Sequence, residues 1–238
     1  MPPVGDGRQP PGEHRPVSVG RPPWWLMGVS LVVTAAVTTD LLARGRLERM
    51  DLKVSEVVSS WGLQNSPFTY WPVWSVAQFG GRGFILAVVA ALVGFLTWRR
   101  RSLLPLARVL VAVALLTAAV YAFKYGTGRT APSYPGSFFH RDGASFPSGH
   151  VANAVLVWGV VRWQAVEFGL PVRLQRLLRL VSIAGPVITG AAMVSLDFHW
   201  VTDAVVGGAL GILLLGVVHA LDATVLSRWV GALGWRSA

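Results

Sequence analysis

The chain alternates between long apolar segments and shorter polar ones. About six apolar runs of roughly fifteen to twenty residues recur along it, and at a rise of 1.5 Å per helical residue such runs approach or match the thickness of a lipid hydrocarbon core. The second run, residues 84–98, is short, so the helix could begin before residue 84. The pattern predicts an all-α integral membrane bundle of about six transmembrane helices. The expected spans are residues 24–43, 84–98, 103–123, 151–168, 177–196 and 204–221.

The segments outside these spans are polar or mixed. Residues 1–23 are rich in proline and lack the apolar core and cleavage site of a signal peptide, so they are expected to form a disordered cytoplasmic tail. Residues 52–61 have the pattern of an amphipathic helix lying on the membrane surface. The predicted organisation is therefore the tail 1–23, a membrane domain over 24–222, and a short cytoplasmic tail over 223–238.

Composition supports a membrane protein. Hydrophobic residues make up 53% of the 238 and charged residues only 13%, well below the share of a soluble domain. The absence of cysteine excludes a disulfide framework, a thiol nucleophile and a thiolate metal site. A net charge of +10 would suggest nucleic acid in a soluble protein. Here the basic residues follow the membrane topology, so no nucleic-acid partner is expected.

The distribution of arginine predicts the orientation. With six spans the two termini share a side, and most arginines outside the spans fall on it. By the positive-inside rule that side is cytoplasmic, and the segment 124–147 and the turn around His199 face outward. The segment 44–53 counts against this orientation because it places four basic residues outside. The arginines on the cytoplasmic side are Arg8, Arg15, Arg21, Arg99, Arg100, Arg101, Arg162, Arg173, Arg176, Arg179, Arg228 and Arg236. The four basic residues of the segment 44–53 are Arg44, Arg46, Arg49 and Lys53.

Three polar clusters lie at the outer ends of the last four spans. They cover residues 124–132, 146–150 and 197–203. Taken singly, each has an ordinary structural explanation: a snorkelling lysine, a serine that caps a helix, and a histidine–aspartate pair. Taken together, they contain the parts of a phosphate site.

The phosphate-binding candidates are Lys124, Arg129, Ser148 and Gly149. Ser148 and Gly149 open the fourth span, where free backbone N–H groups attract an anion. Lys124 and Arg129 add positive charge from across the loop, and an arginine fork suits phosphate oxygens.

The catalytic candidates are His199, Asp203 and His150. His199 and Asp203 are four residues apart, which places them on one face if the turn is helical. The carboxylate can then fix one ring nitrogen and leave the other as a nucleophile, while His150 protonates the leaving oxygen. No carboxylate cluster suggests a metal, so neither metal nor cofactor is expected. His140 and Arg141 are interpreted as part of a solvated loop.

The chain resembles the type 2 phosphatidic acid phosphatase (PAP2) superfamily. That family carries a lysine followed by six residues and Arg-Pro, then Pro-Ser-Gly-His, then Ser-Arg, five residues, a histidine, three residues and an aspartate. The middle motif is complete here at 147–150, and all three spacings agree. The resemblance implies that His199 forms a phosphohistidine, Asp203 orients it, His150 is the general acid, and Lys124, Ser148 and Gly149 bind phosphate. It also implies metal-independent action on lipid phosphates or pyrophosphates.

Two arginines of the family pattern are missing. Ala131 stands before Pro132, and Ala192-Met193 stands in place of Ser-Arg. Arg129 is the candidate substitute, with Arg141 a weaker one. Losing two cationic groups should weaken transition-state stabilisation. Because the nucleophile, its carboxylate and the acid are all kept, we expect an active enzyme with altered phosphate handling.

Three functions remain open at this stage. The first is a phosphatase acting outside the cytoplasmic membrane on an isoprenoid or glycerolipid phosphate, such as an undecaprenyl-type pyrophosphate or phosphatidic acid. The second is a phosphotransferase that uses the same phosphohistidine. The third is a non-catalytic protein that binds or transports lipid phosphates. The expected partners are a lipid phosphate substrate and membrane lipids, and the oligomeric state is left open.

Overall fold

The computed structural model describes residues 20–229, which are mainly helical. Most of the tail expected over 1–23 therefore lies outside the described residues, as does the end of the tail expected over 223–238. The helices are α1 (Trp24–Leu42), α2 (Arg46–Ser60), η1 (Leu63–Asn65), α3 (Pro67–Ala77), α4 (Arg82–Arg100), α5 (Leu104–Thr127), α6 (Gly149–Glu167), α7 (Val172–Ser195), α8 (Val201–Leu221), the π-helical turn η2 (Asp222–Leu226) and α9 (Ser227–Trp229).

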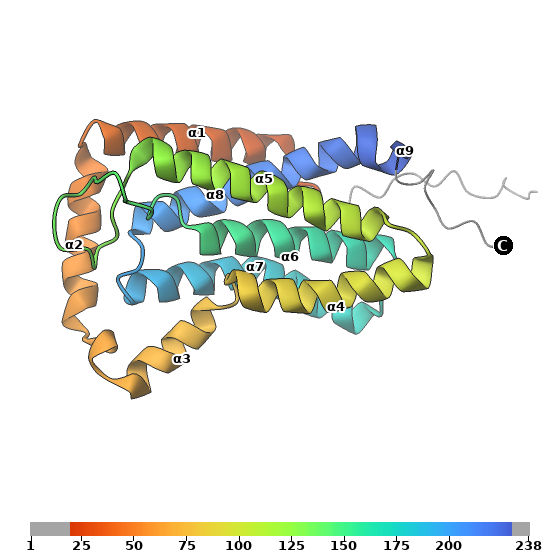
Figure 1. The fold of residues 1–238 in the computed structure, drawn as a ribbon, viewed down its shortest axis with the longest axis horizontal. Coiled ribbons are helices and arrows are strands. Elements are labelled where there is room, and N and C mark those ends of the chain that lie inside the picture. The colour runs from red at the N-terminus through yellow and green to blue at the C-terminus, as the bar shows by residue number, and fades with distance from the viewer. Residues whose placement is uncertain (1–19, 230–238) are drawn as a thin grey trace, which may run out of the picture.

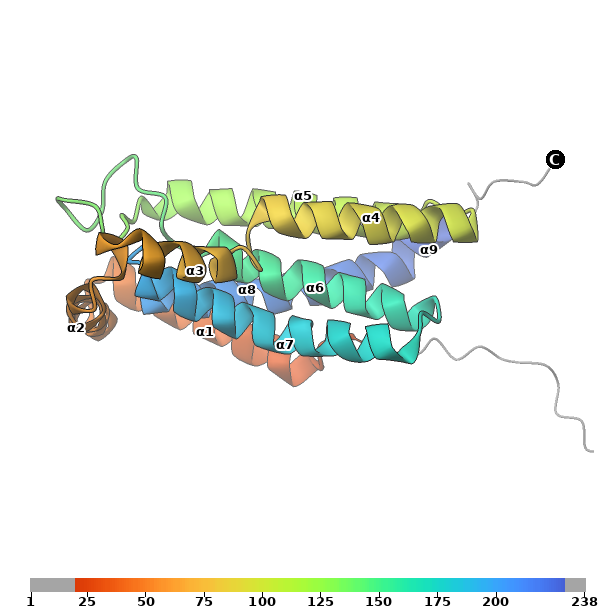
Figure 2. The same cartoon turned by 90° about the horizontal axis from the view of Figure 1, so that it is seen from below.

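The long helices α1, α4, α5, α7 and α8 form a bundle with α6 inside it (Figure 1). Helix α6 packs against α7, α8, α5 and α4, and α1 packs on the outer side of α8. Helix α2 lies across one end of the bundle, and α3 leads from it to α4 along α7 (Figure 2). The expected all-helical membrane bundle is confirmed.

Five helices are long and apolar enough to cross a membrane: α1, α4, α5, α7, and α8 continued through η2. Helix α6, the expected fourth span, is long but carries buried polar residues, among them Asn153 and Gln164. Its position explains this composition, since the surrounding helices shield it from lipid and an internal helix needs less hydropathy.

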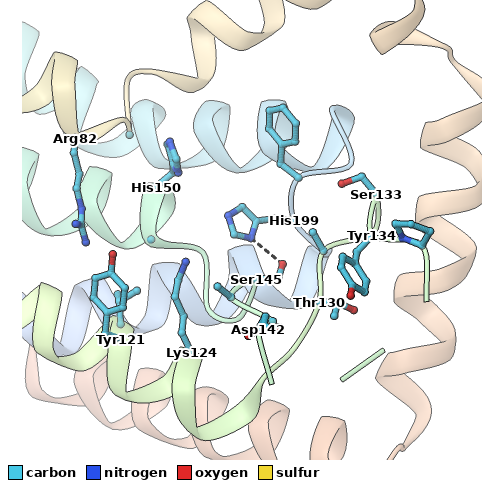
Figure 3. A pocket seen from close by; sticks show the side chains of 18 residues that line it. Arg82, Tyr121, Lys124, Thr130, Ser133, Tyr134, Asp142, Ser145, His150 and His199 are labelled. Atoms are coloured by element: carbon cyan, nitrogen blue, oxygen red, sulfur yellow. Dashed lines mark hydrogen bonds between the residues drawn. The ribbon is translucent and has the colours of Figure 1, made fainter. Parts of the chain in front are cut away.

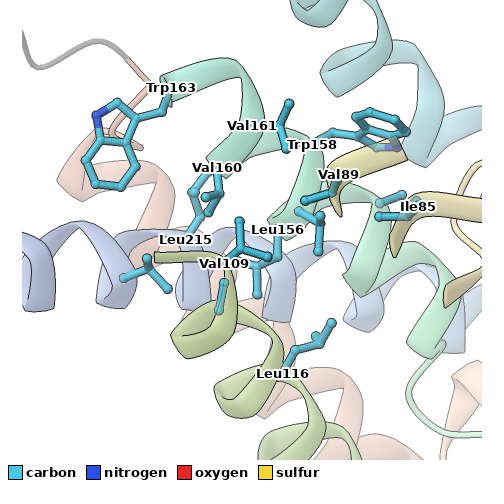
Figure 4. Close-up of a cluster of buried hydrophobic side chains, with 14 of the residues drawn as sticks. Ile85, Val89, Val109, Leu116, Leu156, Trp158, Val160, Val161, Trp163 and Leu215 are labelled. Carbon is cyan, nitrogen blue, oxygen red and sulfur yellow. The ribbon is translucent and has the colours of Figure 1, made fainter. Parts of the chain in front are cut away.

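The packing of α8 against α6 depends on two glycines. A Cβ atom at Gly207 would lie 2.5 Å from the carbonyl oxygen of Ser148, and one at Gly211 would lie 2.7 Å from Val155 Cβ. Their spacing of four residues places them on one face of α8, so the two backbones approach closely. Beyond this contact, Leu156, Val160 and Leu215 join a continuous apolar core with α4 and α5 (Figure 4).

Helix α2 is longer than the predicted segment 52–61 and is fixed at both ends. At its start, the carboxylate of Asp40 accepts the backbone N–H of Leu47 at 2.9 Å. Further along, Ser55 and Ser59 donate to the carboxylate of Asp197, in the turn between α7 and α8, at 3.1 and 2.6 Å. The surface helix is thus fastened to the turn that carries His199. Helix α3 was not predicted.

An ion cluster around a buried arginine fastens the opposite end of the bundle. Arg108 of α5 is 2% exposed. Its Nε lies 2.7 Å from Asp222 of η2, and its Nη1 lies 2.9 Å from Glu167 of α6. Its guanidinium also packs over the Trp163 ring, 4.1 Å from the centroid. Three helical segments are therefore joined around one guanidinium.

Candidate active site

A cavity of about 750 Å³ opens at the end of the bundle crossed by α2. It lies between the starts of α4 and α6, the end of α5, the loop from 128 to 148, and the turn before α8 (Figure 3). The polar side chains that line it include Arg82, Tyr121, Lys124, Thr130, Ser133, Tyr134, Asp142, Ser145, His150 and His199. The structure thus brings together residues from all three sequence clusters.

His199 and Asp203 form a buried pair. The His199 Nδ1 atom lies 3.2 Å from an Asp203 carboxylate oxygen, and Asp203 is fully buried. The geometry differs from the predicted helical face, because α8 begins at Val201 and His199 precedes its N-cap, Trp200. With Nδ1 turned to the carboxylate, Nε2 is the ring nitrogen without a partner among the described residues.

The Asp203 carboxylate is held by more than the histidine. Its Oδ2 also accepts the backbone N–H of Trp200 at 3.1 Å and the hydroxyl of Ser145. Ser145 Oγ lies 3.3 Å from His199 Nδ1 as well. These contacts fix the carboxylate against the imidazole. Sequence reasoning did not select Ser145, which lies outside the three clusters.

Arg129 lies behind Asp203, away from the cavity. Its guanidinium is 2.5 Å from Asp203 Oδ1 and 2.6 Å from Asp51 Oδ2, and the residue is fully buried. Arg129 is absent from the cavity lining. The structure therefore gives it ionic partners other than a phosphate, and its predicted phosphate contact is not supported by this placement.

Asp51 connects the surface helix to the site. This α2 residue is 1% exposed. Besides Arg129, its carboxylate accepts the backbone N–H of Thr202 at 3.2 Å and the hydroxyl of the same residue. The guanidinium between the two carboxylates is also surrounded by the rings of Phe138, Trp200 and Phe146, whose centroids lie 5.0, 5.2 and 5.9 Å away. Asp51 was missed because nothing in its local pattern marks a carboxylate that turns inward.

The N-terminus of α6 faces the cavity. Gly149 and His150 line it, and no acceptor for their backbone N–H groups is found within residues 20–229. Ser148 is fully buried and caps the helix, with its Oγ accepting from Val151 N at 3.5 Å. Its own N–H donates to the Asp203 carbonyl oxygen at 2.9 Å. Ser148 therefore positions this anion-attracting helix end rather than lining the cavity.

Comparison with known proteins agrees with this geometry. The model of the PAP2 superfamily matches residues 105–226, just over half of the chain. The chain belongs to the PAP2 superfamily.

Two relatives sharpen the comparison. Phosphatidylglycerophosphatase B of Bacillus subtilis (strain 168) is 38% identical over 85 residues, which are 35% of this chain and 41% of that protein. The aligned part thus spans less than half of the relative. A crystal structure of a transmembrane PAP2-type phosphatidylglycerolphosphate phosphatase from Bacillus subtilis has the same fold, with a TM-score of 0.63, 22% identity, and coverage of 85% of this chain and 96% of that one.

The two motif arginines missing from this PAP2 chain leave apolar groups in the structure. Ala131 lines the cavity. Met193 is 3% exposed and packs with Ala77 and Ala192 between α3 and α7. Neither position supplies a cation to the site.

The remaining basic side chains near the site differ in placement. Lys124 lies in the last turn of α5, is half-buried and lines the cavity. Arg82 begins α4 and also lines the cavity, although the sequence analysis did not select it. His140 and Arg141 do not line it. The Arg141 side chain is 88% exposed beside Asp142, which agrees with a solvated loop.

Proposed function

We propose that this chain is a membrane phosphatase that hydrolyses a lipid phosphate or pyrophosphate through a phosphohistidine at His199. The observation that carries the proposal is the buried His199–Asp203 pair at the wall of a cavity that also holds His150, Lys124 and the α6 N-terminus. This set contains a nucleophile, the carboxylate that orients it, an acid and an anion site.

In the first step the Nε2 lone pair of His199 attacks phosphorus. A nitrogen–phosphorus bond forms while the bond from phosphorus to the leaving oxygen breaks. His150 gives its proton to that oxygen, so the lipid leaves as an alcohol, or as a monophosphate if the substrate is a pyrophosphate. Asp203 keeps the Nδ1 proton in place and stabilises the positive charge that develops on the ring.

In the second step water attacks the phosphohistidine. His150, now neutral, accepts a proton from the water, and the nitrogen–phosphorus bond breaks to return His199. Inorganic phosphate is released. Each histidine ends the cycle in the protonation state in which it began.

The protein supplies the positive charge that stabilises the transferring phosphoryl group. Lys124 and the free N–H groups of Gly149 and His150 all face the same cavity. Such preorganised donors lower the barrier because they need no reorganisation as charge develops. We therefore propose a reaction that requires no metal ion.

We place the site on the extracytoplasmic face of the membrane. The connections α4–α5 and α6–α7 lie at the end of the bundle opposite α2 (Figure 1). Arg99–Arg101 stand where α4 ends, and Arg173 stands in the first turn of α7. The positive-inside rule assigns that end to the cytoplasm. A cavity at the opposite end would then take lipid phosphates from the outer leaflet.

The test is phosphate release by detergent-purified protein in the presence of EDTA. The substrate panel holds phosphatidylglycerol phosphate, undecaprenyl pyrophosphate and phosphatidic acid. Release that persists in EDTA, disappears in His199→Ala and is unchanged in His140→Ala would support the proposal; His140 is a half-buried loop histidine outside the cavity lining. Full activity in His199→Ala would overturn it, and a phosphorylated acceptor in place of free phosphate would indicate a phosphotransferase.

A further inference from the structure

The phosphate site of this chain is short of positive charge. Ala131 and Met193 stand at the two arginine positions of the family motifs. Arg129 already forms ion pairs with two carboxylates. Of the cations that the sequence predicted, only Lys124 lines the cavity. A phosphate monoester carries about −1.5 to −2 charges near neutral pH. The Lys124 ammonium and the N-terminus of α6 together neutralise only part of this negative charge.

Arg82 is the further cation in the cavity wall. It is the first residue of α4, and its guanidinium lies over the Tyr121 ring, 5.7 Å from the centroid. Figure 3 shows its side chain extending from the start of α4 toward Tyr121, with Lys124 beyond. Arg82, Lys124 and His150 line the same cavity.

The segment that carries Arg82 is fixed against α6. Asn153 Nδ2 donates to the carbonyl oxygen of Gly80 at 2.9 Å, and Trp158 Nε1 donates to that of Phe79 at 2.9 Å. A Cβ atom at Gly80 would collide with the His150 carbonyl oxygen. A glycine is therefore needed for this close approach. The start of α4 is held beside the helix end that attracts the anion.

Arg82 has no carboxylate partner among the residues that the structure describes, and neither does Lys124. Each of the two buried arginines, by contrast, is paired with two carboxylates. Two cations without counter-ions in one cavity wall repel each other unless an anion lies between them. This arrangement is typical of a site that is completed by its ligand.

We propose that Arg82 binds the phosphoryl group that is transferred to His199, in place of the two arginines that the family motifs would supply. This inference rests on the proposed phosphatase function and adds a residue to it. The planar guanidinium offers paired N–H groups to two phosphate oxygens, which a lysine cannot match. Tyr121 supports the guanidinium from the side of α5.

The experiment compares Arg82→Gln, Arg82→Lys and Arg82→Gln/Ala131→Arg with the wild type. We expect Arg82→Gln to lower kcat/KM about 100-fold on single-phosphate and two-phosphate lipids alike, since one such donor is worth about 10²–10³. Arg82→Lys should retain an intermediate activity. The double variant should recover a large part of the loss. Position 131 also lines the cavity, and Ala131→Arg restores the motif arginine there.

A second readout does not depend on turnover. Orthovanadate, a phosphate mimic, should raise the Tm of the wild type and of His199→Ala, and raise it less in Arg82→Gln. Arg99→Gln, which changes an exposed arginine at the far end of the same helix, is the matched control and should behave as the wild type.

Three results would overturn the inference. The first is activity of Arg82→Gln within twofold of the wild type while His199→Ala is inactive, an outcome that leaves the phosphatase proposal standing. The second is a loss confined to lipids with two phosphates, which would place Arg82 on the distal phosphate. The third is a loss that neither lysine nor Ala131→Arg reverses, with vanadate protection unchanged. Full activity in His199→Ala would instead reject the phosphatase proposal itself.

Discussion

The two ends of the bundle each contain a buried arginine held between two carboxylates. At the end opposite α2, Arg108 joins Glu167 and Asp222. At the other end, Arg129 joins Asp51 and Asp203. The difference lies in the next neighbour, because Asp203 also contacts His199 at the cavity wall. None of the three residues of the Arg108 cluster lines a described cavity.

The comparison shows how one kind of ion cluster serves two purposes. The Arg108 cluster connects α5, α6 and η2, and its charged residues line no described cavity. The Arg129 cluster connects α2, the loop from 128 to 148 and α8, and its last carboxylate orients the imidazole. Damage to the first cluster should therefore affect folding alone, whereas damage to the second should affect folding and catalysis together.

The largest difference should appear when one carboxylate in each cluster is neutralised. Asp203→Asn removes the charge that orients and stabilises the His199 ring, and the analogous change in a serine protease triad lowers kcat about 10⁴-fold. Asp222→Asn should leave kcat per folded molecule unchanged. Phosphate release normalised to the monodisperse protein fraction measures both. Equal losses of kcat in the two variants would contradict the distinction.

Replacing the arginines should show a shared structural cost and a separate catalytic one. Arg129→Met leaves two buried carboxylates without their cation, whereas Arg108→Met leaves the buried Asp222 and the exposed Glu167 without theirs. Breaking a buried ion pair destabilises a protein by about 3–5 kcal/mol. Both variants should therefore lower the Tm in detergent. Only Arg129→Met should also reduce the activity of the remaining folded protein, because Asp203 loses its partner. If Arg108→Met reduced that activity as strongly, the two clusters would not be functionally distinct.

A smaller effect is expected from the surface helix. Asp51→Asn keeps the shape of the contact between α2 and the site but weakens the ion pair with Arg129. Arg129 in turn reaches the His199 imidazole through Asp203. Outer partners of this kind at metal sites are worth about 10–100-fold, and we expect a loss near the lower limit. Glu167→Gln is the matched change in the other cluster and should not alter kcat. A wild-type kcat in Asp51→Asn would show that the contact between α2 and Arg129 has no effect on catalysis.

The sequence predicted much of the bundle, since span length and hydropathy are local properties. The ends of the six predicted spans shifted by up to five residues, as in α7, which begins at Val172 rather than at 177. Helix α6 kept its place although it is less apolar than the others, because burial inside the bundle replaces contact with lipid. Helix α3 was missed because its short segment, interrupted by Pro72, resembles a loop.

The site was predicted where its parts lie within motifs and missed where they depend on distant contacts. Lys124, Gly149, His150 and His199 line one cavity, as their motifs suggested. The bond between Asp51 and Thr202 spans 151 positions, and no local pattern reports such a pairing. Arg82 carried a weak signal, the glycines on either side of it. Arg129 was assigned to phosphate from its charge, its fork geometry and its place near the missing motif arginine, and no local pattern reports its two carboxylate partners.

The central claim is that His199 carries the phosphoryl group during turnover. The most direct measurement is to quench the reaction of ³²P-labelled lipid in alkali, which preserves phosphohistidine, and to identify the labelled peptide by mass spectrometry. We predict acid-labile label on the peptide containing His199, and none in His199→Ala, which should also release no phosphate. Label on another residue, or phosphate release by His199→Ala at the wild-type rate, would contradict the claim.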